Sequence, residues 1–203
     1  EKAAAELKER VHQTVTAKLP GIVGLAEMYI GTMHGFCLDL LQTYIPETFK
    51  YGVLTDITQQ LLIDRETNKS GFNTAVKTVQ GVESSLRRYT DTRVFKGALS
   101  ILQEDAVDFG LVPPETTASL AKYKDFLADK RYFDYTSMMV EAVGFLERSQ
   151  TATILDTAEQ SLRDHVENDV KYVIVDEYQD VNPIQERLVA RLVHFGANLC
   201  VVG

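Results

Sequence analysis

The chain has 203 residues, of which 45% are hydrophobic and 25% charged, and its formal net charge is −8. This length and composition are ordinary for a globular protein with a substantial core, organised as one domain or two small ones. No apolar stretch approaches the ~20 residues that span a bilayer, so we expect a cytoplasmic protein with neither a signal segment nor a membrane partner. The net negative charge argues against binding of nucleic acid by bulk electrostatics.

Both cysteines lie within apolar patterns, Cys37 in a helical one and Cys200 in a strand-like one. We therefore expect both to be small buried side chains. Their spacing from the four histidines does not match a zinc site, and we predict neither a metal knuckle nor a disulfide.

The chain opens in a helix. Residues 2–18 carry apolar side chains on one stripe, and no N-cap residue precedes them. At the other end, Asn198 to Gly203 reads as a buried strand, and Gly196 fits the left-handed residue that ends the preceding helix. Because domain ends rarely fall inside a core strand, we expect the chain to be a piece of a larger polypeptide.

A short strand closing at Tyr29 and Ile30 is predicted next, followed by a helix that opens after Thr32. Thr32 is a good N-cap, because its hydroxyl can accept from an unpaired amide of the first helical turn. Considered alone, Thr32 is a plain cap and His34 a structural histidine.

The middle of the chain, residues 46–130, is predicted to be helical throughout, with helices at 76–89, 94–109 and 116–128. Seven basic residues but only three acidic ones lie between Arg65 and Lys96, against the acidic trend of the chain. A basic face there could meet phosphates, with Arg87 and Arg88 as the leading candidates. The alternative is an ordinary solvated helix surface.

Two further helices, at 132–146 and 153–166, lead to a continuous apolar run, Val173 to Val175. Such a run is typical of a central parallel strand buried on both faces. Asp176 and Glu177 follow at its carboxyl end, where open α/β sheets bind ligands. Successive strand residues point to opposite faces, so the two acids should have different roles. One can hold Mg²⁺ through its waters and the other can orient or deprotonate an attacking water.

The next residues are ordinary helix-start signals. Asn182 is a good N-cap, Pro183 fits the first helical position and Gln185 completes a capping box. If nothing else followed the strand, two solvated acids at a strand end would explain Asp176 and Glu177 equally well.

The whole segment, Val-Asp-Glu-Tyr-Gln-Asp at 175–180 with Asn-Pro-Ile-Gln at 182–185, closely resembles the Walker B segment of UvrD-like superfamily-one DNA helicases. The resemblance implies ATP and Mg²⁺ as cofactors, Asp176 as the Mg²⁺ residue acting through water and Glu177 as the general base. It places Gln179 among the nucleotide-binding residues. The implied fold class is α/β and mostly helical: an incomplete RecA-like parallel sheet of the P-loop NTPase type, with an inserted all-α subdomain.

A second segment, Ile-Gly-Thr-Met-His-Gly-Phe at 30–36, resembles the family's Ib/Ic motif, whose Thr and His lie along the single-stranded DNA track. By that resemblance Thr32, His34 and Gly35 are DNA-binding residues, although Met33 replaces the usual aromatic. Residues 2–10 resemble the helix after motif Ia, and 199–203 the strand leading into motif III. The implied organisation is a RecA-like part at 1–45, the inserted helical subdomain at 46–130, and a second RecA-like part with Walker B at 131–203.

The sequence holds no Gly-x4-Gly-Lys-Ser/Thr phosphate loop, which in this family lies upstream of the matched region. We therefore expect the isolated chain to be inactive. The resemblance implies an intact enzyme that moves 3′ to 5′ on single-stranded DNA and unwinds single-strand/duplex junctions, with repair proteins as candidate partners. Two alternatives remain: a subunit of an AddA- or RecB-type helicase-nuclease, and a non-catalytic module whose helical middle docks a protein.

Overall fold

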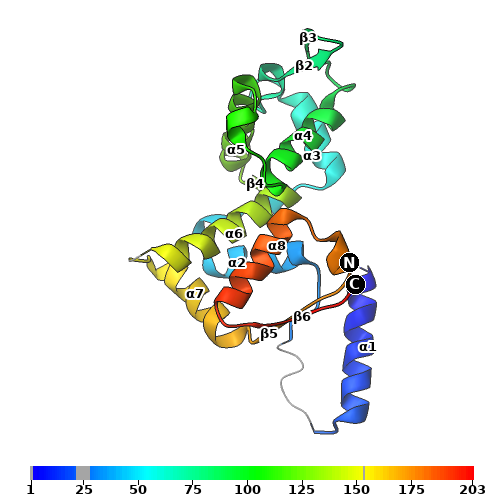
Figure 1. Ribbon diagram of the computed structural model, residues 1–203, viewed down its shortest axis with the longest axis vertical. Coiled ribbons are helices and arrows are strands. Elements are labelled where there is room, and N and C mark those ends of the chain that lie inside the picture. The colour runs from blue at the N-terminus through cyan, green and yellow to red at the C-terminus, as the bar shows by residue number, and fades with distance from the viewer. Residues whose placement is uncertain (1, 22–27, 153) are drawn as a thin grey trace.

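The computed structural model describes residues 2–21, 28–152 and 154–203. Helices dominate, and the strands are short (Figure 1). The helices are α1 (Lys2–Lys18), α2 (Met33–Tyr44), α3 (Asp56–Arg65), α4 (Thr92–Glu104), α5 (Pro114–Lys130), α6 (Tyr135–Thr151), α7 (Thr157–Asp169) and α8 (Pro183–His194). The strands are β1 (Gly52–Val53), β2 (Val76–Val79), β3 (Val82–Ser85), β4 (Tyr132–Phe133), β5 (Tyr172–Val175) and β6 (Asn198–Val201).

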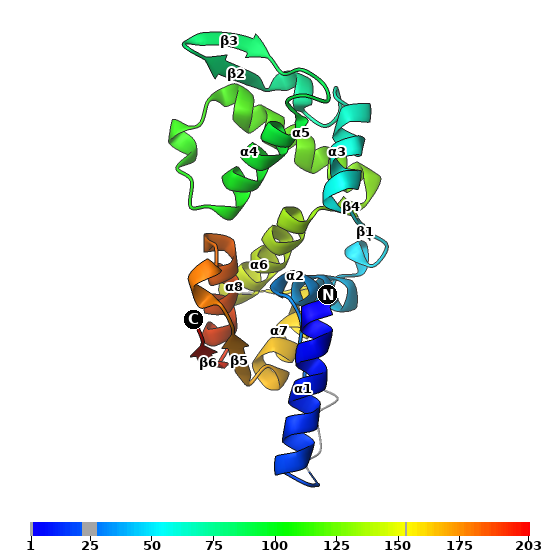
Figure 2. The same cartoon turned by 90° about the vertical axis from the view of Figure 1, so that its right-hand side faces the viewer.

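Two separate hydrophobic cores divide the described residues into a lower and an upper body, stacked along the long axis in both views (Figures 1 and 2). The lower body contains α2, α6, α7 and α8 with β5 and β6. The upper body contains α3, α4 and α5, and the β2–β3 hairpin lies at its far end. The chain crosses between the bodies at β1 and β4, which pair in parallel.

Helix α6 organises the lower core, because it packs against α2, α7 and α8. Its Val143 and Leu146 are fully buried. Cys37 on α2 is also fully buried, as predicted, and burial raises the pKa of its thiol to about 12. The cysteine is therefore a neutral hydrophobic side chain.

The upper core joins the lower one through a buried polar cluster. Asp134, the N-cap of α6, accepts hydrogen bonds from Gln59 Nε2 of α3 at 2.8 Å and from the Tyr123 hydroxyl of α5 at 2.6 Å. Burial and the neighbouring Asp134 carboxylate raise the pKa of Tyr123, which keeps its phenol protonated as the donor. The cluster fixes α3 and α5 to the start of α6 because each of its buried groups has a partner.

The mostly helical α/β class predicted from the sequence is confirmed, but one helix was wrong. Residues 76–85 form an antiparallel hairpin, with Val79 paired to Val82 across a two-residue loop. Both loop residues, Gln80 and Gly81, have positive φ, at 52° and 79°. Two positive φ values define the turn whose twist suits a hairpin, and glycine adopts its second position without strain.

Strands β5 and β6 form a parallel pair, in register from Tyr172 with Asn198 to Val175 with Val201. Only one face is covered: Val175 is buried, whereas Ile174 is 74% exposed. The prediction of a strand buried on both faces was therefore wrong for the described residues, because helix α8 covers a single face. Cys200 on β6 is exposed as well, contrary to expectation.

Several local predictions are confirmed. Thr32 caps α2, Asn182 and Gln185 form the capping box of α8, and Gly196 has φ +105° after that helix. The strand predicted to close at Tyr29 and Ile30 is not seen at residues 28–30, and residues 22–27 lie outside the described part of the chain. None of the described helices is long and apolar enough to cross a membrane.

Candidate functional site

The acid pair lies on a turn rather than in a strand. Strand β5 ends at Val175, and Asp176 and Glu177 follow it as exposed residues before a single turn of 3-10 helix, Tyr178–Asp180. Strand alternation therefore does not set the directions of the two carboxylates. The conformation of the turn sets them instead.

Glu177 has a left-handed backbone, with φ 52° and ψ 45°. A residue with a Cβ pays about 1–2 kcal/mol for this conformation, so the surrounding structure must hold it there. Two backbone hydrogen bonds hold the turn: the amide of Tyr178 donates to the Val202 carbonyl at 2.9 Å, and the amide of Val202 donates to the Val175 carbonyl at 2.9 Å. The turn is thus bound to the chain that follows β6, and strain at a site-forming residue is typical of functional turns.

Gln179 lies beside Glu177, since its side-chain amide donates to the Glu177 carboxylate. The space around it is tight. A Cβ built on Gly203 would come within 2.2 Å of Gln179 Oε1, so glycine at 203 leaves room for the Gln179 side chain. Gln179 therefore orients Glu177 and lies between the acid pair and the end of β6.

The donor set at the turn fits Mg²⁺. Asp176 Oδ1 accepts from the amide of Glu177 at 3.1 Å, which orients the carboxylate. No group of three or more His, Cys, Asp or Glu side chains gathers anywhere in the described residues. Mg²⁺ needs no such cage, because it keeps several waters and binds through one or two carboxylates together with nucleotide phosphates.

The Thr32 segment forms the start of α2. The Thr32 hydroxyl accepts from the amide of Gly35 at 3.1 Å, and the Tyr29 hydroxyl donates to the Thr32 carbonyl at 3.0 Å. A Cβ at position 35 would lie 2.6 Å from the Tyr29 hydroxyl, so any larger residue there would have to displace the Tyr29 side chain. The segment is a helix N-terminus, and the amides of a first helical turn suit phosphate groups.

His34 is half-buried, and its ring meets the edge of Tyr135 with the centroids 5.5 Å apart. Burial lowers the pKa of His34, while the negative charge of Glu104 opposes that effect. Since burial is the larger influence, the imidazole is neutral near pH 7. A contact with DNA would then come from hydrogen bonding or packing rather than from positive charge.

The basic residues of 65–96 are mostly paired with acids. Lys77 and Arg87 both contact Asp91, at 2.6 Å and 3.8 Å, and Lys96 pairs with Asp56. Arg65 and Lys69 both contact Glu66. These pairs reduce the surplus charge available to phosphates.

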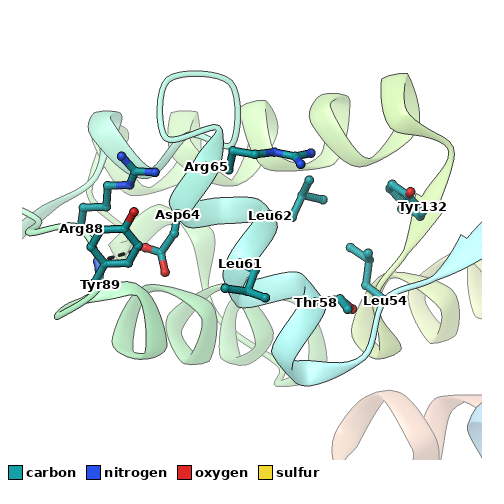
Figure 3. Close-up of a pocket in the computed structure, with 9 residues that line it drawn as sticks. All are labelled: Leu54, Thr58, Leu61, Leu62, Asp64, Arg65, Arg88, Tyr89 and Tyr132. Atoms are coloured by element: carbon teal, nitrogen blue, oxygen red, sulfur yellow. Dashed lines mark hydrogen bonds between the residues drawn. The ribbon is translucent and has the colours of Figure 1, made fainter.

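Arg88 is different, because its guanidinium lies over the Tyr89 ring at 4.7 Å from the centroid. Both side chains line an open hollow of about 450 Å³ in the upper body. Figure 3 shows Arg88 and Tyr89 at one end of this hollow and Leu54 and Tyr132 at the other. The structure thus separates Arg88 from the acid pair, which belongs to the lower body.

One contact between the bodies was not predicted. Glu104, at the end of α4, accepts from Asn182 Nδ2 at 2.9 Å and from the Thr136 hydroxyl. Glu104 therefore connects Asn182, the residue after the acid turn, to α6, the helix that packs against His34. No sequence signal marked it, because the partners are far apart along the chain and Glu104 lies in no motif.

The acid turn at the end of a parallel strand and the two separate cores together describe a mostly helical α/β protein. Residues 1–203 match the UvrD/REP helicase N-terminal domain family, and the chain belongs to it. The incomplete RecA-like fold expected from the Walker B resemblance is thereby confirmed.

Similar relatives are ATP-dependent DNA helicases named PcrA. The one from Staphylococcus aureus (strain Mu50 / ATCC 700699) is 28% identical over 204 residues, which cover 100% of this chain and 25% of the relative. The one from Staphylococcus epidermidis (strain ATCC 12228 / FDA PCI 1200) is 28% identical over 213 residues, with the same coverage. The chain thus spans about a quarter of the length of the curated relatives it matches.

Proposed function

We propose that this chain is the part of an ATP-dependent DNA helicase that carries its Walker B acids and part of its single-stranded DNA track. The observation that carries the proposal is the acid turn: Asp176 and Glu177 follow a parallel strand, and Glu177 is held in a left-handed conformation with Gln179 bonded to its carboxylate. Family membership over the whole chain supports the same conclusion.

In this proposal Asp176 holds Mg²⁺ through water, and Glu177 is the general base for the attacking water. Bound Mg²⁺ would neutralise charge on the β and γ phosphates of ATP. Gln179 fixes the orientation of the Glu177 carboxylate and lies on the nucleotide side of the turn. The exposed position of both acids leaves them accessible to a nucleotide held by residues outside this chain.

We propose further that Thr32, His34 and Gly35 contact single-stranded DNA, through backbone amides and the Thr32 hydroxyl at the start of α2. Arg87 and Arg88 would contact the duplex at a single-strand/duplex junction. Translocation from 3′ to 5′ and docking of repair proteins are carried over from the family resemblance alone. Residues 46–130 are proposed to be a subdomain inserted into the RecA-like core, in keeping with their own hydrophobic core.

The isolated chain should hydrolyse no ATP above background, because it lacks a phosphate loop and positioned donors supply much of the transition-state stabilisation. DNA-stimulated turnover by the isolated chain, abolished by Glu177→Gln, would contradict this expectation.

The decisive experiment uses the full-length protein. Glu177→Gln should keep nucleotide affinity and reduce ATP turnover by at least ~10²-fold, because it removes the base and preserves shape. Glu186→Gln, an exposed glutamate on the first turn of α8, is the matched control and should keep full turnover. Equal, small losses in both variants would mean that the acid turn is only surface and would favour the non-catalytic module.

A further inference from the structure

Glu104 brings two polar groups together on one carboxylate, one from α6 and one from the N-cap of α8. It is the last residue of α4, the helix of the upper body that contacts both α6 and α8 of the lower body. One of its oxygens accepts from Asn182 Nδ2 at 2.9 Å, and the other accepts from the Thr136 hydroxyl. Hydrogen bonds to an ionised carboxylate are shorter and stronger than neutral ones, so this contact couples the positions of its partners.

Asn182 is the end of this contact that leads to the acid turn. Its Oδ1 accepts from the amide of Gln185 at 3.0 Å and caps α8, while its Nδ2 donates to Glu104. Only an amide side chain offers an acceptor for the helix and an NH₂ donor for the carboxylate at once. Asn182 follows directly on the acid turn at 176–181. Its hydrogen bond to Glu104 therefore holds the C-terminal end of that turn in place.

Thr136 is the end that leads to the DNA segment. It is 5% exposed, and its hydroxyl lies 3.1 Å from Ser100 Oγ in addition to its bond to Glu104. Its neighbour Tyr135 packs edge-on against His34. A displacement at the start of α2 would therefore reach the first turn of α6 through packed rings.

We propose that Glu104 is a positioning residue that transmits DNA binding at the Thr32–Gly35 segment to the acid pair, through Thr136 on one side and Asn182 on the other. This inference rests on the proposed helicase function. Glu104 touches neither nucleotide nor DNA in this scheme. Its effect lies in the DNA dependence of ATP turnover, because a coupling residue changes how strongly one site responds to the other.

The test measures the stimulation factor in the full-length protein, defined as ATP turnover with saturating single-stranded oligonucleotide divided by turnover without it. Glu104→Gln should lower this factor on the order of 5–10-fold, since one of the two donors then faces an amide NH₂. Asn182→Asp should lower it similarly. It keeps an N-cap oxygen on α8 but sets a second carboxylate against Glu104.

The double variant Glu104→Gln with Asn182→Asp reverses the direction of the hydrogen bond, because the glutamine amide can now donate to the aspartate. We expect the stimulation factor to recover to within about twofold of the wild type, which two independent structural defects would not do. Asp105→Asn, the exposed neighbour at the C-cap of α4, is the matched control and should keep the wild-type factor.

Unchanged factors in the single variants would overturn the inference, and so would single losses that the double variant fails to restore. Glu177→Gln measured in the same assay separates this outcome from a failure of the proposed function. If Glu177→Gln abolishes turnover while the Glu104 variants leave the factor unchanged, only the coupling is wrong. If Glu177→Gln retains turnover, the helicase assignment itself fails.

Discussion

Two carboxylates of this chain, Asp134 and Glu177, lie in opposite surroundings. Asp134 is 3% exposed and accepts from Gln59, from Tyr123 and from the amide of Ser137. Glu177 is exposed on a left-handed turn, and within residues 2–21, 28–152 and 154–203 its carboxylate accepts a side-chain hydrogen bond from Gln179 alone. A carboxylate whose oxygens are saturated inside the protein holds helices together, whereas an exposed carboxylate on a strained backbone is available to an outside ligand.

The largest effect is expected from Asp134→Ala, which tests whether the buried carboxylate stabilises the fold. We expect it to lower the free energy of unfolding by about 3–5 kcal/mol, because it removes the N-cap of α6, takes the acceptor from the buried Tyr123 hydroxyl and leaves Gln59 Nε2 with its bond to Tyr123 alone. Urea unfolding followed by circular dichroism would measure the loss.

Asp129→Ala on α5 is the control for Asp134→Ala, since the Asp129 side chain is 72% exposed and forms a long ion pair with its neighbour Lys130 at 3.9 Å. It should change stability by less than about 0.5 kcal/mol. A loss from Asp134→Ala no larger than that of the control would mean that the buried cluster does not hold the two bodies together.

The opposite result is expected at the acid turn. Asp176→Ala should leave the unfolding midpoint nearly unchanged, and in the full-length protein it should raise the Mg²⁺ concentration needed for half-maximal nucleotide binding by about 10–100-fold. Titration of Mg²⁺ at fixed nucleotide would measure it. Glu186→Ala is the control, and an Asp176→Ala curve that coincides with it would remove Asp176 from the metal site.

Asp91 gives a pH-dependent version of the comparison. Hydrogen bonds from Lys77 Nζ at 2.6 Å and from the amide of Arg87 at 2.7 Å hold the pKa of Asp91 below its ordinary value of 3.8. A lowered pKa means that the ionised form is favoured in the folded state. Its stabilisation is therefore complete above pH 3.8 and disappears as the pH falls below that value, through the folded pKa.

Thermal unfolding of the wild type and of Asp91→Asn at a series of pH values tests this sign. The wild type should be the more stable protein near pH 6, and the difference should shrink as the pH falls below 3.8. A difference that stays constant across this range would mean that the charge of Asp91 does not anchor the β2–β3 hairpin.

The features that were predicted correctly from the sequence depend on short-range signals. Thr32, Asn182 and Gln185 cap helices within three residues of themselves, and the apolar run before Asp176 was a parallel strand. The hairpin also had a local signal, since Gln80 and Gly81 follow a run with three β-branched residues, Val76, Thr78 and Val79. It was predicted as a helix because the helical pattern expected on both sides was taken to continue through it.

Long-range features could not be read in this way. Glu104 meets Asn182 across 78 positions of the chain, and Gln59 meets Asp134 across 75. No local pattern encodes such a pair, because the fold alone brings the partners together. The exposed outer face of β5 was equally hidden, since a continuous apolar run does not tell how many layers cover it.

The smallest effect is expected at Arg87 and Arg88. Arg87 Nε lies 3.8 Å from Asp91 Oδ2, but the Arg87 side chain is 72% exposed. The Arg88 guanidinium lies over the Tyr89 ring, and both side chains line the open hollow of Figure 3. If they contact phosphates, replacing both by alanine should weaken binding of a single-strand/duplex junction and reduce the dependence of log affinity on log salt by about 1–2 units. The control replaces Arg163 and Arg187 of the lower body, which pair with Glu167 and Glu147. Salt titrations of the full-length protein with equal slopes in both double variants would leave Arg87 and Arg88 as solvated surface, and the upper body would then be the better candidate for docking a protein.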